Sequence, residues 1–248
     1  RLTLVRNLMC TEGELMMVAG GAARVVTAWM SIGLPWGVSK IMREHVESGR
    51  VPLEEWSHLA LGLRFRAAAM GVPFLPALTM LGSDLMAVGG TRTLECPYTG
   101  EPLALIPALF PDVALLHVHR ADRFGNCQID GYPHMDADIA RAASTVLVTT
   151  EEIIPEEDTR RHPDRTVIPG FVVDALVQQG VRHVARLLHQ PLVGFQVGKA
   201  QHGLAGLARA QKFARSANFQ VAPRDLETVG GLAHRHQLPL PAGLRLPP

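Results

Sequence analysis

The sequence predicts an α/β protein with an open, largely parallel sheet flanked by helices. Short aliphatic runs alternate with segments of helical spacing, and several of these runs are apolar at every position. Continuous apolar runs of this length are typical of strands buried on both faces of a parallel sheet. The 47% hydrophobic content of the 248 residues is enough for a buried core.

The first third of the chain shows this alternation most clearly. The predicted elements are strands over residues 2–5 and 23–29 and helices over 11–19 and 38–47. Another helix is predicted from Leu53, because acidic residues follow at once and Gly71 marks its end. Strand and helix therefore follow each other as in a parallel sheet covered by helices.

The middle of the chain continues the pattern. The predicted elements are buried strands over 103–109, 113–118 and 145–150, an amphipathic helix over 134–143 and a solvated loop over 154–165. Glu151 and Glu152 are predicted to begin a helix, where acidic side chains favour the helix dipole.

The charge of the chain changes near residue 178. Residues 179–248 carry nine Lys+Arg against two Asp+Glu, whereas residues 1–178 carry 15 against 21. We therefore expect one domain over 1–177 and an atypical basic tail over 178–248 that is poorly ordered or not native sequence. Its scattered charges and few aromatic residues do not predict a nucleic-acid-binding module.

Cysteine content and hydropathy argue against a disulfide-rich, zinc-binding or membrane-spanning protein. Three widely spaced cysteines support neither a disulfide framework nor a zinc site, and they fit a reducing cytoplasm. No apolar run reaches the roughly 18 residues of a membrane span. We expect a cytoplasmic protein without contact to a membrane.

An abrupt change of polarity predicts a site after the strand over 113–118. The string HRADRFGN places Arg120, Asp122 and Asn126 at the carboxyl end of a core strand, the edge where open α/β sheets bind ligands. We expect an Arg120–Asp122 pair and a turn at Asn126 that shape this site.

We call residues 119–126, the string HRADRFGN, the elbow. One histidine lies two residues before the elbow and a second is its first residue. His117 and His119 face the same side of a strand, which is compatible with a metal pair. Two ligands without a nearby third make a poor zinc site, so we expect no metal.

Several strings of the chain, taken together, resemble the A (alpha) subunit of the glutaconate-type CoA-transferases, which are family I (two-subunit) CoA-transferases. The strings are LRFRAAAMGVPFLP, LGSD, PYTGEPL, PALFPDVALLHVHRADRFGN, TTEEI and IPGFVVDALV. The resemblance covers residues 1–177 and implies the open α/β sheet of the CoA-transferase (NagB-like) fold. The family's glycine-rich loop after its first strand is missing here, so the domain is expected to be truncated at its N-terminus.

The resemblance also implies a reaction and a partner. In this family a glutamate attacks an acyl-CoA thioester, and a glutamyl-CoA thioester then passes CoA to an acceptor acid. The glutamate lies on the B subunit, so the resemblance implies no catalytic nucleophile in this chain and a heterodimer or heterotetramer with a B subunit. Coenzyme A is expected as a substrate, and no permanently bound cofactor is expected.

The remaining site residues are candidates for oxyanion or substrate binding. Asn7 matches an asparagine that helps to form the oxyanion hole of the related succinyl-CoA:3-oxoacid enzymes, and His58 is a hydrogen-bond donor beside Ser57. Gly82 allows close backbone approach, and the Ser83 hydroxyl suits an acid substrate. Each residue also has a structural interpretation, in which it only caps or supports a local turn.

We therefore expect the A subunit of a CoA-transferase, acting on an acyl-CoA and a small dicarboxylic or keto acid. One alternative is a CoA-dependent ring-opening hydrolase on the same fold, although His58 stands at the position that, by resemblance, holds a catalytic glutamate in such hydrolases. Another is a non-catalytic subunit that binds acyl-CoA, because both the nucleophile and the glycine-rich loop are missing.

Overall fold

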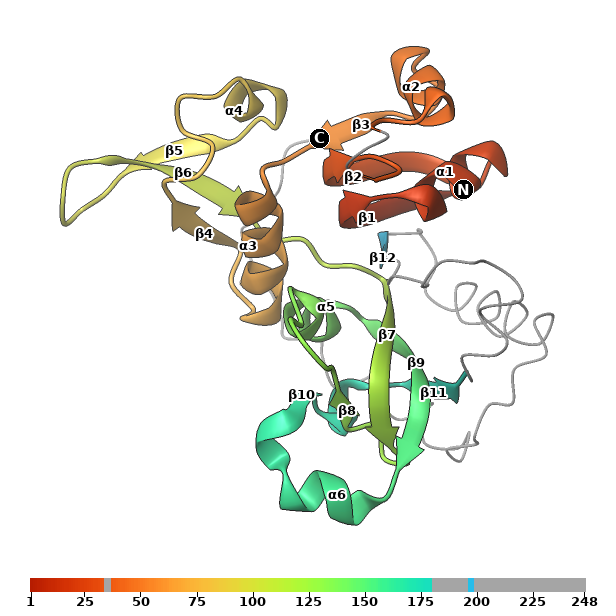
Figure 1. Ribbon diagram of the computed structural model, residues 1–248. Coiled ribbons are helices and arrows are strands. Elements are labelled where there is room, and N and C mark those ends of the chain that lie inside the picture. Colours follow the sequence, from red (N-terminus) through yellow and green to blue (C-terminus); the bar gives the residue numbers. More distant parts are fainter. Residues whose placement is uncertain (34–36, 180–195, 199–248) are drawn as a thin grey trace, which may run out of the picture.

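A computed structural model describes residues 1–33, 37–179 and 196–198 of the chain (Figure 1). Its main sheet has nine strands within these residues. In order of pairing, they are β10 (Thr166–Ile168), β8 (Cys127–Gln128), β7 (Val113–Asp122), β12 (Gln196–Gly198), β1 (Leu2–Met9), β2 (Ala22–Met30) and β3 (Leu53–Glu55), while β9 (Thr145–Ile154) pairs with β7 and β11 (Ala175–Gln178) pairs with β9.

Parallel pairing dominates this sheet. Strands β1, β2 and β3 form one parallel group, and β7, β9 and β11 form another. The short β12 lies antiparallel between β1 and β7 and joins the two groups. The prediction of an open, largely parallel sheet flanked by helices is confirmed.

A second, three-stranded antiparallel sheet consists of β4 (Phe74–Ala77), β6 (Pro102–Pro107) and β5 (Arg92–Glu95). The helices are α1 (Thr11–Val18), α2 (Lys40–Glu47), α3 (His58–Ala69), α4 (Leu85–Val88), α5 (Asp136–Ala142) and α6 (Glu156–Arg161). Figure 1 shows α3 between the small sheet and the main sheet. It contacts β4 and β6 on one side, β1 and β2 on the other, and α5 along its length.

Two hydrophobic clusters hold these layers together. The larger one includes Trp56, Phe65, Ile106 and Val118, so it spans both sheets and α3. The smaller one packs α1 and α2 against β1 and β2, around Met42. Burial of apolar area in these clusters is the main force that fixes α3 against the sheets.

The predicted helix from Leu53 is wrong at its beginning. Leu53–Glu55 is β3, which pairs in parallel with β2. Trp56 is then buried, and Ser57 caps α3, which begins at His58. The acidic residues therefore lie on an edge strand, because backbone pairing with β2 outweighs their fit to a first helical turn.

The predicted strand over 103–109 belongs to a different sheet than expected. It is β6, whose residues alternate between buried and less buried positions in the small antiparallel sheet. Apolar side chains on both faces indicated a core strand, but one face of β6 packs on α3 and the other remains partly exposed.

Three core strands are longer than predicted. Strand β1 continues to Met9 and does not end at Val5, so Asn7 lies inside this strand. Strand β7 continues to Asp122, so Arg120 lies inside the strand and not after its end. Strand β9 continues to Ile154, so Glu151 and Glu152 are strand residues and do not begin a helix. The helix follows as α6, inside the segment that was predicted to be a loop. Strands β7 and β9 pair with each other along their whole length, which explains why both continue beyond their predicted ends.

No helix in the described ranges has the length and apolar content of a membrane span. The predicted basic tail over 178–248 lies outside the described residues except at Gln178, residue 179 and β12.

Phe65→Ala tests the importance of α3 for the core. Phe65 is fully buried, so its truncation should lower the free energy of unfolding by about 3–5 kcal/mol. Leu59→Ala on the same helix is the matched control, since Leu59 is 59% exposed and its loss should change stability by about 0.5 kcal/mol or less. Urea unfolding of the chain measures both, and equal losses would contradict this packing.

Candidate functional site

The side chain of Asn7 connects β1 to the start of α3. Asn7 is only 6% exposed, and its Nδ2 donates to the backbone carbonyl of His58 at 3.0 Å. The same Nδ2 lies 3.5 Å from His58 Nδ1. If Nδ1 accepts from this amide, the proton of a neutral imidazole is on Nε2. Asn7 therefore positions His58, whose side chain is exposed, and does not itself face solvent.

Ser57 caps α3 and links it to the segment after β4. Its Oγ accepts a hydrogen bond from the backbone N–H of Ala60 at 3.1 Å, which satisfies one free donor of the first turn. The same hydroxyl lies 2.8 Å from Thr79 Oγ1. Ser57 therefore places the turn that contains Gly82 and Ser83 beside the start of α3.

That turn is fixed by its own hydrogen bonds. Ser83 Oγ donates to the carbonyl of Met80 at 2.7 Å, and Gly82 has a φ of 75°, a conformation that favours glycine. The Ser83 hydroxyl keeps its lone pairs for a ligand but has already used its proton. Substrate contacts of Gly82 and Ser83 stay predictions.

A half-buried polar cluster holds α3 against the sheet edge. Glu54 accepts from Trp56 Nε1 and from Arg64 Nη1, both at 2.6 Å, and the Arg64 guanidinium lies 4.3 Å from the centre of the Trp56 ring. Burial raises the pKa of Glu54, but the hydrogen bonds and charges of its partners outweigh burial and leave the pKa below its ordinary value. The carboxylate is therefore a structural anchor for the first turns of α3.

The sequence pattern did not single out His134 or Asp136 as site residues. The fold brings His134 beside His58. Met135 packs so closely on Gly62 of α3 that a Cβ on Gly62 would overlap the Met135 Cε. Burial lowers the pKa of His134, and the neighbouring His58 lowers it further. His134 also has a φ of 50°, which is uncommon for a residue other than glycine.

Asp136 is the first residue of α5 and follows His134 by two positions. Burial raises its pKa to about 6, although the nearby Arg6 opposes the shift. Arg6 forms its own ion pair with Glu12. We call Asn7, His58, His134 and Asp136 the α3–α5 site. It combines two imidazoles, a carboxyl group whose pKa is raised to about 6 and a buried amide.

The residues of the elbow form a separate structural unit. Arg120 does not pair with Asp122; its Nη1 and Nη2 contact both carboxylate oxygens of Asp130 at 2.9 and 2.5 Å. The predicted Arg120–Asp122 pair is therefore wrong. Side chains two apart on a strand do share a face, but the Asp122 carboxylate is hydrogen-bonded to donors of its own turn.

Asp122 and Asn126 lock the end of β7. The fully buried Asp122 carboxylate accepts from the backbone N–H groups of Phe124 and Asn126 and from Asn126 Nδ2. Asn126 Oδ1 then accepts from the N–H of Gly170 at 2.8 Å. The predicted turn at Asn126 is present, and it ties the elbow to a distant segment.

The two histidines of β7 have separate protein partners. His117 Nδ1 lies 2.9 Å from Thr149 Oγ1, and His119 Nδ1 accepts from the N–H of Asp130 at 3.1 Å. Among the residues that the structure describes, no group of three potential ligands could hold a metal ion.

Asp136→Asn tests the shifted carboxyl group. The pKa of Asp136 is raised on folding, so its favourable contribution is complete below its unfolded value near 3.8 and is lost as pH rises through about 6. The asparagine side chain of the variant does not titrate, so the variant does not lose this stability as pH rises. The variant should therefore gain stability over the wild type between about pH 4 and 6, by about 3 kcal/mol at most, and keep the gain at higher pH. Urea unfolding at several pH values measures this, and a variant less stable than wild type at pH 8 would contradict it.

Comparison with known proteins agrees with this architecture. The chain is 35% identical over 157 residues to the A subunit of glutaconate CoA-transferase from Acidaminococcus fermentans, covering 56% of this chain and 49% of that protein. It is 34% identical over 181 residues to the A subunit of 3-oxoadipate CoA-transferase from Pseudomonas knackmussii, covering 71% and 62%. The chain thus spans less than two thirds of these curated relatives.

Solved structures show the same fold. The structure of glutaconate coenzyme A-transferase from A. fermentans matches with a TM-score of 0.67 and 29% identity, over 72% of this chain and 62% of that chain. A variant of the decarboxylase AibA/AibB matches with a TM-score of 0.65 and 29% identity, over 94% and 82%. The family described as coenzyme A transferase matches residues 15–179. The chain belongs to the coenzyme A transferase family.

Proposed function

We propose that this chain is the A subunit of a two-subunit CoA-transferase that moves CoA between an acyl-CoA and a small dicarboxylic or keto acid. Membership of the family and similarity to two A subunits support this proposal. The observation that carries it is the contact between Asn7 and His58, which presents one imidazole at the start of α3.

The covalent step belongs to a glutamate of the partner subunit. Its carboxylate attacks the thioester carbonyl and the C–S bond breaks. CoA leaves as a thiolate, and the acyl group remains on the glutamate as a mixed anhydride. The thiolate then attacks the glutamyl carbonyl, which releases the first acid and leaves a glutamyl-CoA thioester. The acceptor carboxylate then attacks the glutamyl-CoA thioester and displaces the CoA thiolate, which gives a second mixed anhydride. The thiolate attacks the acceptor's carbonyl in that anhydride, which forms the new acyl-CoA and frees the glutamate.

This chain contributes hydrogen-bond donors to that reaction. Negative charge develops on the thioester oxygen as the carboxylate attacks, and a fixed donor stabilises it more than it stabilises the ground state. His58 suits this role because its Nδ1 faces the Asn7 amide and its Nε2 is directed away from that contact. His134, beside it, offers a second polar group for the acid substrate.

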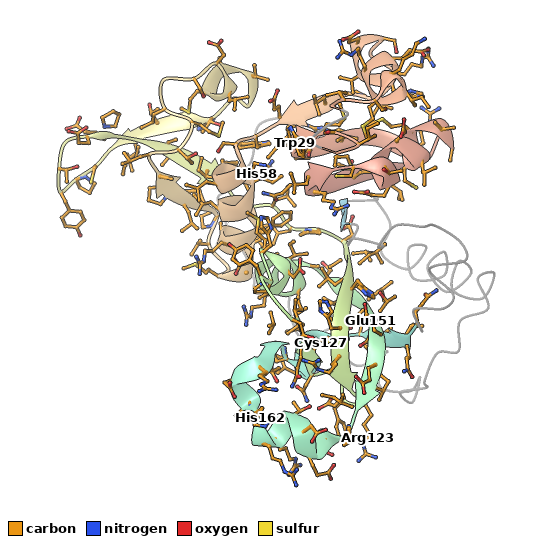
Figure 2. The ribbon with its side chains drawn as sticks, viewed as in Figure 1. Trp29, His58, Arg123, Cys127, Glu151 and His162 are labelled. Carbon is orange, nitrogen blue, oxygen red and sulfur yellow. The ribbon has the colours of Figure 1, made fainter. Side chains whose placement is uncertain are left out.

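Substitution of His58 tests this role in the chain combined with its B subunit. His58→Ala should lower kcat/KM for CoA transfer by about 10²–10³, the usual cost of one oxyanion donor. His58→Gln keeps an N–H donor and should recover part of the loss. His162→Ala, an exposed histidine far from His58 in Figure 2, should leave the rate within about twofold. Equal rates for the His58→Ala and His162→Ala proteins would remove His58 from the mechanism.

A second candidate function is decarboxylation of an acyl-CoA that carries a free carboxyl group. The match to the decarboxylase covers 82% of that chain, a larger share than the match to the transferase structure. In such a reaction a carboxylate leaves as CO₂ and a proton takes its place, and an exposed imidazole such as His58 is a suitable proton donor.

The two functions are separated by omitting the acceptor acid. A transferase should release no CO₂ from a dicarboxylic acyl-CoA and should form a new acyl-CoA only when the acceptor is added. Release of CO₂ without any acceptor would favour the decarboxylase and contradict the transferase proposal.

A further inference from the structure

A cleft of about 750 Å³ lies at the end of β7, away from the α3–α5 site. Its walls come from the elbow, α5, α6 and the segment around Pro169. In Figure 2, Arg123 of the elbow and His162 after α6 lie far from His58. None of the residues that line the cleft belongs to the α3–α5 site.

The wall formed by the elbow is rigid. Asn126 joins the Asp122 carboxylate to the N–H of Gly170. Gly170 lies so close to the elbow that an added Cβ would overlap the carbonyl oxygen of Phe124. A wall fixed in this way needs little reorganisation when a ligand binds.

Both carboxylates of the cleft are already engaged by groups of the protein. Asp122 accepts three hydrogen bonds from its own turn. Glu156 is paired with Arg160, with a contact of 2.5 Å, and with Arg123 at 3.6 Å. These acidic groups therefore repel an anion less strongly than free carboxylates would.

Donors in the cleft are in excess. Within the described part of the chain, no hydrogen bond or ion pair engages the guanidinium of Arg141, which projects from α5. The hydroxyls of Thr159 and Thr166 also have no partner there, although both oxygen atoms are buried and Thr159 is only 8% exposed. An unpaired buried hydroxyl is costly, so an acceptor group of a ligand that reached it would be stabilised.

We propose that this cleft binds the phosphate group of a nucleotide-sized ligand. A phosphate has enough terminal oxygens to accept from an arginine fork and from two hydroxyls together. The volume suits a small organic molecule and exceeds that of a lone ion. Phe124, Pro163 and Pro169 supply apolar wall for the rest of such a ligand. The inference does not depend on the proposed transferase activity.

Calorimetric titration of the full chain with ADP tests the proposal. ADP should bind, and adenosine, which lacks the phosphates, should bind at least tenfold more weakly. Arg141→Ala should weaken ADP binding at least tenfold, whereas Arg161→Ala, an exposed arginine outside the cleft, should change it less than twofold. Thr159→Val should weaken binding, and Thr159→Ser, which keeps the hydroxyl, should restore it.

Other outcomes overturn the proposal or refine the source of the phosphate. Absence of ADP binding, equal affinity in the Arg141→Ala protein, or tighter binding of succinate than of ADP would each overturn it. Competition between CoA and ADP for this cleft would support the nucleotide end of CoA as the source, and ADP binding unaffected by CoA would support a free nucleotide. Circular dichroism checks that each variant is folded, so a loss of affinity reports on the cleft.

Discussion

The hydrogen bond from the Asn7 amide to the carbonyl of His58 connects the central sheet to the helix that carries the candidate site. These residues are 51 positions apart in the sequence, and no local pattern links them. Because Asn7 is buried, a displaced α3 would leave its amide unpaired at a cost of about 1–3 kcal/mol. The bond therefore favours one position of the first turn of α3, and the position of His58 depends on it.

The surrounding structure reinforces this position. Ser57 caps the same turn, the Glu54 carboxylate joins Trp56 and Arg64 below it, and α5 packs against it through Gly62. Helix α3 contacts both sheets, so the core and the site share one element. A substitution in the core of α3 is thus expected to alter stability and site geometry together.

Much of the fold could be predicted from local patterns. The strands β1 and β2 and the helices α1 and α2 follow from apolar spacing within a few residues of their ends. The predicted elements are wrong where pairing with a strand distant in the sequence determines the secondary structure. Leu53–Glu55 has the composition of a helix start but pairs with β2, and Glu151 and Glu152 continue β9 because β7 runs beside them. Which sheet contains β6 depends on contacts with β4 and β5 that its own residues do not encode.

The candidate site was predictable only in part. Asn7 and His58 were singled out by resemblance, and the structure brings them into contact. His134 and Asp136 were missed because the packing of α5 on α3 brings them there; a histidine and an aspartate at a helix start gave only a weak signal. Arg120 was assigned the wrong partner for a similar reason, since Asp130 reaches it through the return of the chain after β8.

A double-mutant cycle between Asn7→Ala and His58→Ala tests whether Asn7 positions His58 for the reaction. It would measure kcat/KM for the proposed CoA transfer by the chain combined with the proposed B subunit. If Asn7 acts by positioning His58, the second substitution should cost little once the first is made, giving a coupling energy of about 1 kcal/mol or more. Losses that add within about 0.3–0.5 kcal/mol would show that the two residues act independently and would contradict the positioning role of Asn7.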